Sequence, residues 1–210
     1  MKAARLNLKN GADLLKFMST GGVMTPGTNP GATQLSSEEI KVIIREAHNA
    51  GKKTATHAIG REGIRNAVLA GVDSIEHGAY MDQETMEEMK LRGTFHVPTL
   101  LALEQAVVRF EDLPEFMRAK VDKIRDLPYE TFSRSHKAGV RAAAGTDGGS
   151  FFNPHGGLAG EVALMVRSGL SHMAAIKAAT SGAAEALGIA QKVGTIEPGK
   201  AADIILVDGN

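Results

Sequence analysis

The chain has 210 residues, its 24 lysines and arginines are balanced by 24 aspartates and glutamates, and it contains neither cysteine nor tryptophan. This composition argues against a basic or base-stacking nucleic-acid surface. Without cysteine there are no disulfides and no thiolate ligands, so a metal would need histidine or oxygen ligands. No apolar run approaches the roughly 18 residues of a membrane span. We therefore expect a globular, cytoplasmic protein that binds neither nucleic acid nor membrane.

The first half of the chain alternates short apolar runs with amphipathic helices. A run at 13–18 leads into a glycine-rich loop at 19–31, and a helix then begins at the capping-box pattern Ser36-Ser37-Glu38-Glu39. Apolar residues recur along that helix at positions i, i+3, i+4 and i+7, which predicts one buried stripe. The elements predicted next are a strand at 54–58, a helix closed by Gly71, a strand at 72–77 and a helix at 82–91.

The second half continues this alternation. It predicts a strand at 94–100, a helical region at 101–138 interrupted near Pro114 and Pro128, a strand at 140–145, helices at 157–167 and 171–187, and a last β signal at 202–207. Strands alternating with helices predict a parallel sheet with right-handed crossovers. Five such strands suit an open doubly wound sheet or five-eighths of a closed (β/α)8 barrel, which typically needs about 250 residues.

Four ionisable residues lie near the carboxyl ends of predicted strands, and each is followed within a few residues by glycine. They are Lys16, His57, His77 and Asp147. In parallel α/β folds this end of the sheet carries the active site. Because burying an unpaired charge is costly, four such groups at one end predict a shared partner. A divalent metal ion would satisfy all four.

Each of these residues also has a purely structural explanation. Lys16 can extend to solvent from an edge strand, and His57 can be a hydrogen-bonded core histidine. His77 can form a local polar pair with Glu76, and Asp147 can cap the next helix. Their common position at one end of four strands favours the metal site over these separate explanations.

The other motifs carry less information. The glycine-rich loop lacks the phosphate-binding patterns G-x-x-x-x-G-K-[ST] and G-x-G-x-x-G, and the chain has no G-x-S-x-G nucleophile elbow. A position inside a strand explains His96 as well as function does, and loop structure does the same for His155. The residues that we place near a substrate are Tyr80, His96, Thr99 and His155.

The order of the four strand-end residues resembles the amidohydrolase superfamily. Lys16 lies in LLKFMSTGGVMTPG, His57 in TATHAIG, His77 in DSIEHG and Asp147 in AAGTDGG. The resemblance is closest to the imidazolonepropionase-like and Xaa-Pro dipeptidase-like branches, and the segment AATSGAAEALGIAQKVGTIEPGKAADIILVDGN is similar to the family's last helix and closing strand. It implies an α/β fold in which residues 1–190 form a partial (β/α)8 barrel, about strands 4–8, and residues 191–210 a β segment of an accessory domain.

The same resemblance implies the chemistry. Lys16 would react with CO2 to form a carbamate, and His57 and His77 would bind a divalent ion, usually zinc in this family. Asp147 would contact a second ion or a bridging water and act as general base in the hydrolysis of an amide or other C–N bond. The implied substrate is a dipeptide with a C-terminal apolar residue or proline, and a small cyclic amide such as an imidazolone is the alternative.

One departure from the family pattern is the absence of the H-x-H pair of its first strand. The first three barrel strands are also not recognisable, so we expect the C-terminal part of a family member. The open alternatives are a non-catalytic fragment or pseudoenzyme and a metal-free α/β binding protein. Because an open barrel exposes two strand edges, we expect completion by another copy, as a homo-oligomer, or by a missing N-terminal segment.

Overall fold

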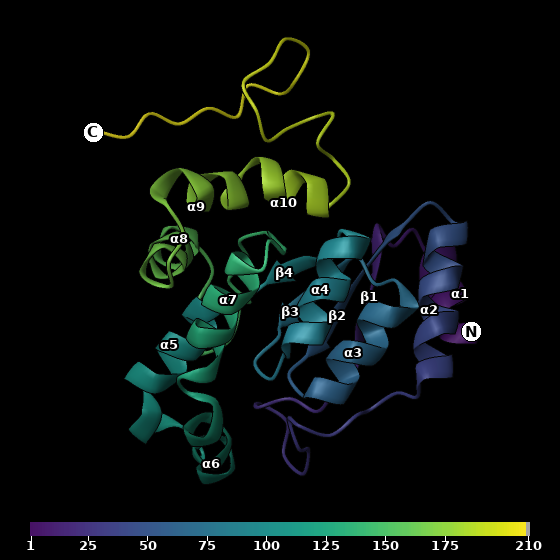
Figure 1. Cartoon of the computed structure of the whole chain (residues 1–210), viewed down its shortest axis with the longest axis vertical. Coiled ribbons are helices and arrows are strands. Elements are labelled where there is room, and N and C mark those ends of the chain that lie inside the picture. Colours follow the sequence, from purple (N-terminus) through teal and green to yellow (C-terminus); the bar gives the residue numbers. More distant parts are fainter. Residues whose placement is uncertain (209–210) are drawn as a thin grey trace.

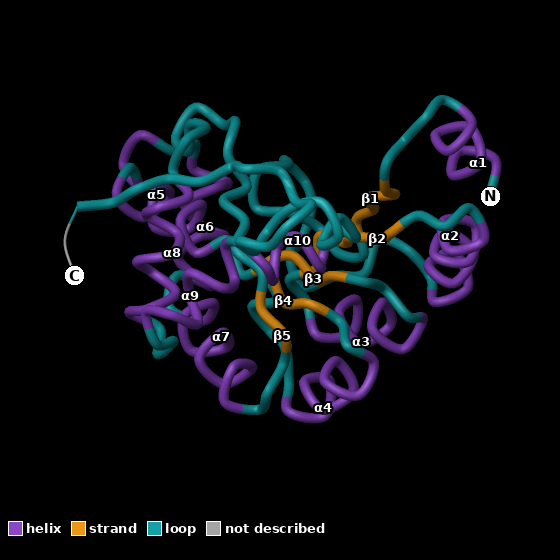
Figure 2. Tube along the Cα trace, turned by 90° about the horizontal axis from the view of Figure 1, so that it is seen from above, coloured by secondary structure: helices purple, strands orange, loops and turns teal. Residues whose placement is uncertain are grey.

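The sheet consists of five parallel strands arranged in sequence order in the computed structural model, which describes residues 1–208. Its strands are β1 (Leu14–Met18), β2 (Lys53–Ala58), β3 (Ser74–His77), β4 (Phe95–Val97) and β5 (Arg141–Ala142). A doubly wound sheet reverses its strand order at a switch point, whereas this sheet does not. The partial (β/α)8 barrel expected from the sequence is therefore confirmed, and Figure 2 shows the strands as an arc seen from above.

Helices follow the strands on the outer side of this arc (Figure 2). The first group is α1 (Lys2–Lys9), α2 (Ser37–Asn49), α3 (Arg61–Ala70) and α4 (Gln83–Arg92). A second group lies on the left and across the top of Figure 1. It contains α5 (Leu100–Val108), α6 (Glu115–Ile124), α7 (Leu127–Lys137), α8 (Leu158–Arg167), α9 (His172–Ala179) and α10 (Ser181–Ala186). A short 3-10 turn, Phe110–Asp112, joins α5 to α6.

The outer face of the sheet packs against α2, α3 and α4, whereas the inner face contacts a helix at β4, where Phe95 and Val97 pack with α10. In β1, Leu15 and Phe17 are buried, whereas Lys16 and Met18 alternate with them and are exposed on the other face. The largest core cluster joins this buried face to α2, α3 and α4. The inner face of the arc therefore carries the residues that are available for function.

Helix α2 begins where its sequence predicts. The Ser36 hydroxyl accepts a hydrogen bond from the Glu39 N–H, and the Glu39 carboxylate accepts one from the Ser36 N–H, so the predicted capping box is confirmed. Its predicted apolar stripe is buried at Ile40, Ile44 and Ala47. Buried apolar area of this kind contributes roughly 25 cal/mol per Å².

Several boundaries differ from the sequence prediction. Strand β4 ends at Val97 because Leu100 already begins α5, and the predicted helix at 171–187 is broken at Thr180, whose dihedral angles are not helical. The segment predicted as β structure at 202–207 forms no strand up to residue 208, and its apolar residues are exposed because no neighbouring strand pairs with them. Residues 209–210, the last two of the predicted accessory segment 191–210, lie outside the described residues.

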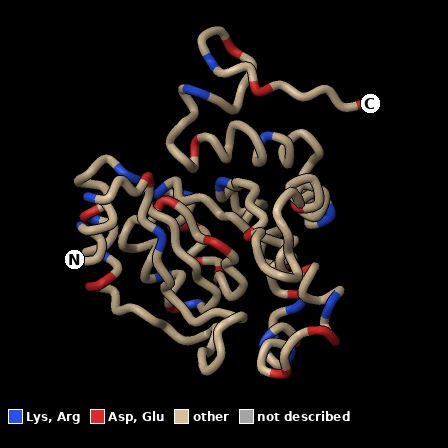
Figure 3. Tube along the Cα trace, turned by 180° about the vertical axis from the view of Figure 1, so that it is seen from behind, with Lys and Arg blue, Asp and Glu red and all other residues tan. Residues whose placement is uncertain are grey.

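The periphery of the molecule matches its neutral composition. Lysines and arginines are interspersed with aspartates and glutamates along the trace in Figure 3. Among residues 1–208, no helix has both the length and the apolarity to cross a bilayer. The strands β1 and β5 are the two ends of the sheet order. Completion of these edges by another segment or copy, and the division at residue 190, stay predictions.

Candidate active site

A cavity of about 400 Å³ lies at the carboxyl ends of the strands. All four strand-end residues singled out in the sequence line it: Lys16, His57, His77 and Asp147. The parallel register explains part of this convergence, because His57 is the partner of Met18 in β1, and His77 is the partner of Ala58 in β2. The sequence prediction that these four residues share one site thus has a physical basis in the sheet.

The two histidine rings lie against each other in this cavity. Their centroids are 4.5 Å apart and the planes are inclined by 69°. His57 Nε2 is 3.0 Å from the Gly21 carbonyl oxygen, which can only accept, so Nε2 carries the proton and Nδ1 keeps its lone pair. Nδ1 of His57 has no hydrogen-bond partner within residues 1–208.

His77 has the opposite tautomer. Its Nδ1 lies 2.7 Å from the Thr99 hydroxyl oxygen, and that hydroxyl donates its own proton to the Pro98 carbonyl at 2.7 Å. The Thr99 oxygen therefore accepts from Nδ1–H, and the lone pair of His77 is on Nε2. Metal-binding histidines commonly donate their second ring N–H to such a partner, which fixes the ring orientation.

Both imidazoles are held in the neutral form. Burial lowers the pKa of His57, and the Lys16 charge lowers it further, against the raising effect of the Gly21 carbonyl and Asp147. Burial also lowers the pKa of His77 well below its usual value, with added repulsion from His57 and Lys16. Neutral imidazole is the form that binds metal ions.

Backbone strain is concentrated at this site. Within the described part of the chain, three non-glycine residues have a positive φ, namely His77 (70°), Thr99 (51°) and Asp147 (51°), and all three line the cavity. Such conformations cost about 1–3 kcal/mol each and persist where surrounding contacts enforce them. At Asp147, the buried Asn153 side chain supplies such contacts, because its Nδ2 donates to the carbonyls of Thr146 at 2.7 Å and Asp147 at 3.1 Å.

The ligand set fits a metal ion only with a contribution from Lys16. Across residues 1–208, no three side chains from histidine, aspartate and glutamate come together as a metal site. A lysine ammonium has no lone pair to donate, whereas a carbamate provides carboxylate oxygens. Lys16 Nζ is partly exposed and its nearest acidic atom is Glu76 Oε2 at 3.9 Å. The two free ring nitrogens and a Lys16 carbamate together would give three ligands, enough for a catalytic zinc.

The side wall of the cavity is apolar and comes from α5, α6 and the loop after β5. It contains Leu103, Ala106, Val121, Ile124 and Phe152. The loop after β1 is bonded to this wall through Lys120 of α6, whose Nζ donates to the Gly22 carbonyl (3.0 Å), the Thr25 carbonyl (2.6 Å) and the Thr28 hydroxyl (3.2 Å). The cavity can therefore hold an apolar group beside the histidines.

The other residues placed near a substrate by the sequence lie elsewhere. His96 is fully buried, and its Nε2 donates to the His77 carbonyl at 3.0 Å, so it supports the histidine pair from behind. Tyr80 is half-exposed, and His155 lies beside Gly149 in the loop after β5. Of the four, only Thr99 lines the cavity. Substrate contact by Tyr80, His96 and His155 stays a prediction.

Thr99 and Asn153 are functional candidates whose roles the sequence pattern did not reveal. Thr99 was placed near a substrate but fixes a histidine tautomer instead. Asn153 carried no signal beyond its place in an Asn-Pro loop, although its Oδ1 is buried without a partner among the described residues.

Comparison with known proteins gives consistent matches. The model of the amidohydrolase family matches residues 1–210. Ochratoxinase of Aspergillus niger is 36% identical over 212 residues, covering 100% of this chain and 43% of the relative.

Solved structures of related proteins also match this chain. A Xaa-Pro dipeptidase with bound methionine in the active site superposes with a TM-score of 0.94 at 40% identity, over 100% of this chain and 52% of that one. A prolidase complexed with N-methylphosphonate-L-proline has a TM-score of 0.93 at 31% identity, over 100% and 51%. The chain thus spans about half the length of the relatives that it matches.

Proposed function

Because this chain belongs to the amidohydrolase family, we propose that its cavity is the active site of a metal-dependent hydrolase of amide C–N bonds. The observation that carries this proposal is the pair of neutral histidines with complementary tautomers, each leaving one ring nitrogen unprotonated in the same cavity as Lys16 and Asp147. A metal-free binding protein would have no need for this arrangement.

The residues that would hold the metal are those whose nitrogen or oxygen atoms have available lone pairs. They are Nδ1 of His57, Nε2 of His77, a carbamate on Lys16 and, for a second ion or its water, the carboxylate of Asp147. The carbamate forms when the neutral amine of Lys16 adds to CO2 and releases one proton. A divalent ion, which we propose to be zinc, would lower the pKa of a water molecule and polarise the scissile carbonyl.

Asp147 is the proposed general base. Its carboxylate makes no hydrogen bond to any described residue, and its strained backbone is clamped by Asn153. It can therefore accept a proton from the attacking water and pass it to the leaving amine as the C–N bond breaks. General-base catalysis of this kind typically contributes a factor of about 10²–10⁴ in rate.

We propose a dipeptide with a C-terminal apolar residue or proline as substrate class. Its support is the apolar wall of the cavity, together with the likeness to a Xaa-Pro dipeptidase and a prolidase. A small cyclic amide is the alternative.

A second candidate is a non-catalytic fragment or pseudoenzyme of the family. The observation that favours it is the absence of an H-x-H pair from the sequence, which leaves one metal site without its usual histidines. In this case the chain would bind an ion through His57, His77 and Lys16 without turnover.

The experiment is metal analysis of the purified full chain after incubation with zinc and bicarbonate. Hydrolysis assays follow on Xaa-Pro dipeptides, dipeptides with another C-terminal apolar residue, and small cyclic amides. The proposal expects bound zinc and turnover. His57→Ala and His77→Ala should lower the zinc content, whereas the exposed His172→Ala, the matched control, should not. Zinc without turnover supports the second candidate, and absence of bound zinc overturns both.

A further inference from the structure

Thr99 immediately precedes helix α5, at the N-cap position, but its side chain does not cap the helix. Serine, threonine or aspartate at this position normally accepts a hydrogen bond from an N–H of the first turn, as Ser36 does for α2, Asp82 for α4 and Ser171 for α9. The Thr99 hydroxyl instead bonds to the Pro98 carbonyl and to His77 Nδ1. The first N–H groups of α5 therefore need a different acceptor.

Glu161 of α8 is that acceptor. Its Oε1 lies 3.0 Å from the Leu100 N–H nitrogen, and its Oε2 lies 2.6 Å from that of Leu101. The residue is fully buried, although it is 60 positions away along the chain. A carboxylate at the start of a helix is also favoured by the helix dipole. Glu161 thus caps the first turn of α5, which the Thr99 side chain does not.

The first turn of α8 allows this close approach. Gly157 and Gly160 face Leu101, and a Cβ built on them would lie 2.4 Å and 3.2 Å from its methyl groups. Without side chains at these positions, α8 can come near enough to α5 for a glutamate to reach its N–H groups. Glu161 is also the one ionisable residue in the otherwise apolar stretch 158–166.

We propose that Glu161 is a positioning residue for His77. By accepting both N–H groups of α5, it leaves the Thr99 hydroxyl to accept from His77 Nδ1–H, which keeps Nε2 unprotonated and available to a ligand. The consequence for catalysis rests on the proposed function, but the ring tautomer does not.

The test is the tautomer of His77, read from long-range ¹H–¹⁵N correlation spectra of the metal-free full chain. In Glu161→Gln, the amide NH₂ opposes one of the two α5 donors, so the Thr99 hydroxyl should turn toward the helix and His77 should become a mixture of tautomers. Glu46→Gln is the matched control, because Glu46 is also buried and accepts two hydrogen bonds, from Arg5. It should leave His77 unchanged.

Variants at Thr99 separate positioning from simple destabilisation. Thr99→Ser keeps the hydroxyl and should retain the single tautomer, whereas Thr99→Ala should lose it even though Glu161 still caps α5. Zinc affinity should fall by about 10-fold or more in Glu161→Gln, the size typical of lost support for a ligand, and stay unchanged in Glu46→Gln.

Two results would overturn the proposal. One is an unchanged His77 tautomer in a folded Glu161→Gln variant. The other is rapid hydrogen exchange of the Leu100 and Leu101 amides in the unmodified chain, a measurement that remains decisive if the variant does not fold. A chain that binds no zinc but shows the expected tautomer shift removes the proposed function and leaves the positioning role intact.

Discussion

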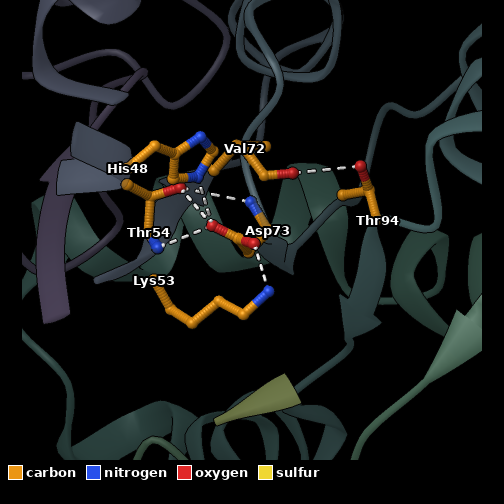
Figure 4. A network of polar contacts seen from close by, with 6 residues as sticks. All are labelled: His48, Lys53, Thr54, Val72, Asp73 and Thr94. Carbon is orange, nitrogen blue, oxygen red and sulfur yellow. Dashed lines mark hydrogen bonds and ion pairs between the residues drawn. The ribbon is translucent and has the colours of Figure 1, made fainter. Parts of the chain in front are cut away.

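Histidine and aspartate side chains occur at both ends of the sheet, but their polar atoms are hydrogen-bonded at one end, and some are left without partners among the described residues at the other. At the amino ends of the strands, the Asp73 carboxylate accepts hydrogen bonds from His48 Nε2 at 2.8 Å, from Lys53 Nζ at 2.7 Å and from both N–H and hydroxyl of Thr54 at 2.9 Å (Figure 4). Its acceptor capacity is used within the protein, so this cluster joins α2, β2 and β3 into one unit.

At the carboxyl ends, the histidine rings are fixed in orientation, but some of their polar atoms have no hydrogen-bond partner within residues 1–208. His57 and His77 each keep a ring nitrogen free of partners in the described part of the chain, and strained backbone is found at His77, Thr99 and Asp147. The comparison shows that hydrogen-bond partners within the chain mark stabilising groups. Unused lone pairs together with strain characterise the groups that we propose to bind a ligand.

The largest effect expected from this contrast is on catalysis. Asp147→Asn should lower kcat for a cleaved dipeptide by a factor of about 10²–10⁴ because the proposed general base is lost. Its thermal stability should hardly change, since the carboxylate has no hydrogen bond in residues 1–208. Steady-state kinetics and calorimetry measure both. A kcat equal to that of the unmodified enzyme would show that another group takes the proton.

The second effect concerns pH, because the pKa values of two carboxylates near the two ends, the buried Glu161 and the half-buried Asp73, are shifted in opposite directions. Burial raises the pKa of Glu161 to about 7, against the lowering effect of the Leu101 and Leu100 N–H groups, so the folded state holds its proton more tightly than the unfolded state. Stability from this group should be greatest below about pH 4.5 and fall by about 3 kcal/mol as the pH rises to 7.

Burial tends to raise the pKa of Asp73, but hydrogen bonds from Lys53, His48 and Thr54 outweigh it and hold the pKa below its usual value. The stability contribution of Asp73 is therefore complete above its unfolded pKa, near 4, and is lost as the pH falls through the lower folded value. Urea unfolding between pH 3 and 8 measures both slopes. Glu161→Gln should flatten only the near-neutral slope, and an unchanged slope there would contradict the assignment.

The third effect is on stability at the amino end. Asp73→Asn should lower the free energy of unfolding by about 2 kcal/mol, since the amide loses the charge-assisted bonds from Lys53 and His48. Chemical denaturation at neutral pH measures the loss. Activity and zinc content should stay as in the unmodified chain. If Asp73→Asn were stable but inactive, the amino end of the sheet would contribute to activity as well as to stability.

The smallest expected effect tests the strain itself. Asp147→Gly should be more stable than Asp147→Ala by about 1 kcal/mol, because glycine adopts a positive φ without the penalty that a Cβ brings. Both variants lack the carboxylate, so the comparison isolates the backbone. Equal melting temperatures would indicate that the backbone at this position relaxes in both variants.

Much of the fold was predictable because its signals are local. The capping box at Ser36 and the stripe of α2 depend on contacts three or four residues apart, and both are confirmed. The strand at 202–207 was predicted from apolar residues alone. It does not form within the described residues because a strand also needs a neighbour to bond with, and sequence periodicity does not show whether one is present.

In the candidate site too, some features could be predicted from the sequence and others could not. The grouping of Lys16, His57, His77 and Asp147 was predictable because parallel strands in succession bring their carboxyl ends to one edge. The tautomers were not, since they depend on the Gly21 carbonyl and the Thr99 hydroxyl, which reach the rings across 36 and 22 positions of the chain. The only sequence signal for Glu161 is that it is a single glutamate in the apolar stretch of α8. Its hydrogen-bond partners could not be predicted from that.

The sequence by itself determined the alternation of strands and helices and the strand ends at which ionisable residues occur, because chain periodicity, caps and turns are local properties. Only the tertiary structure decided which atoms of those residues stay free. Hydrogen bonds between distant segments use up the carboxylate of Asp73 and leave one nitrogen each on His57 and His77. That choice is made by packing, since a lone pair is available only where no neighbouring donor has been brought within reach.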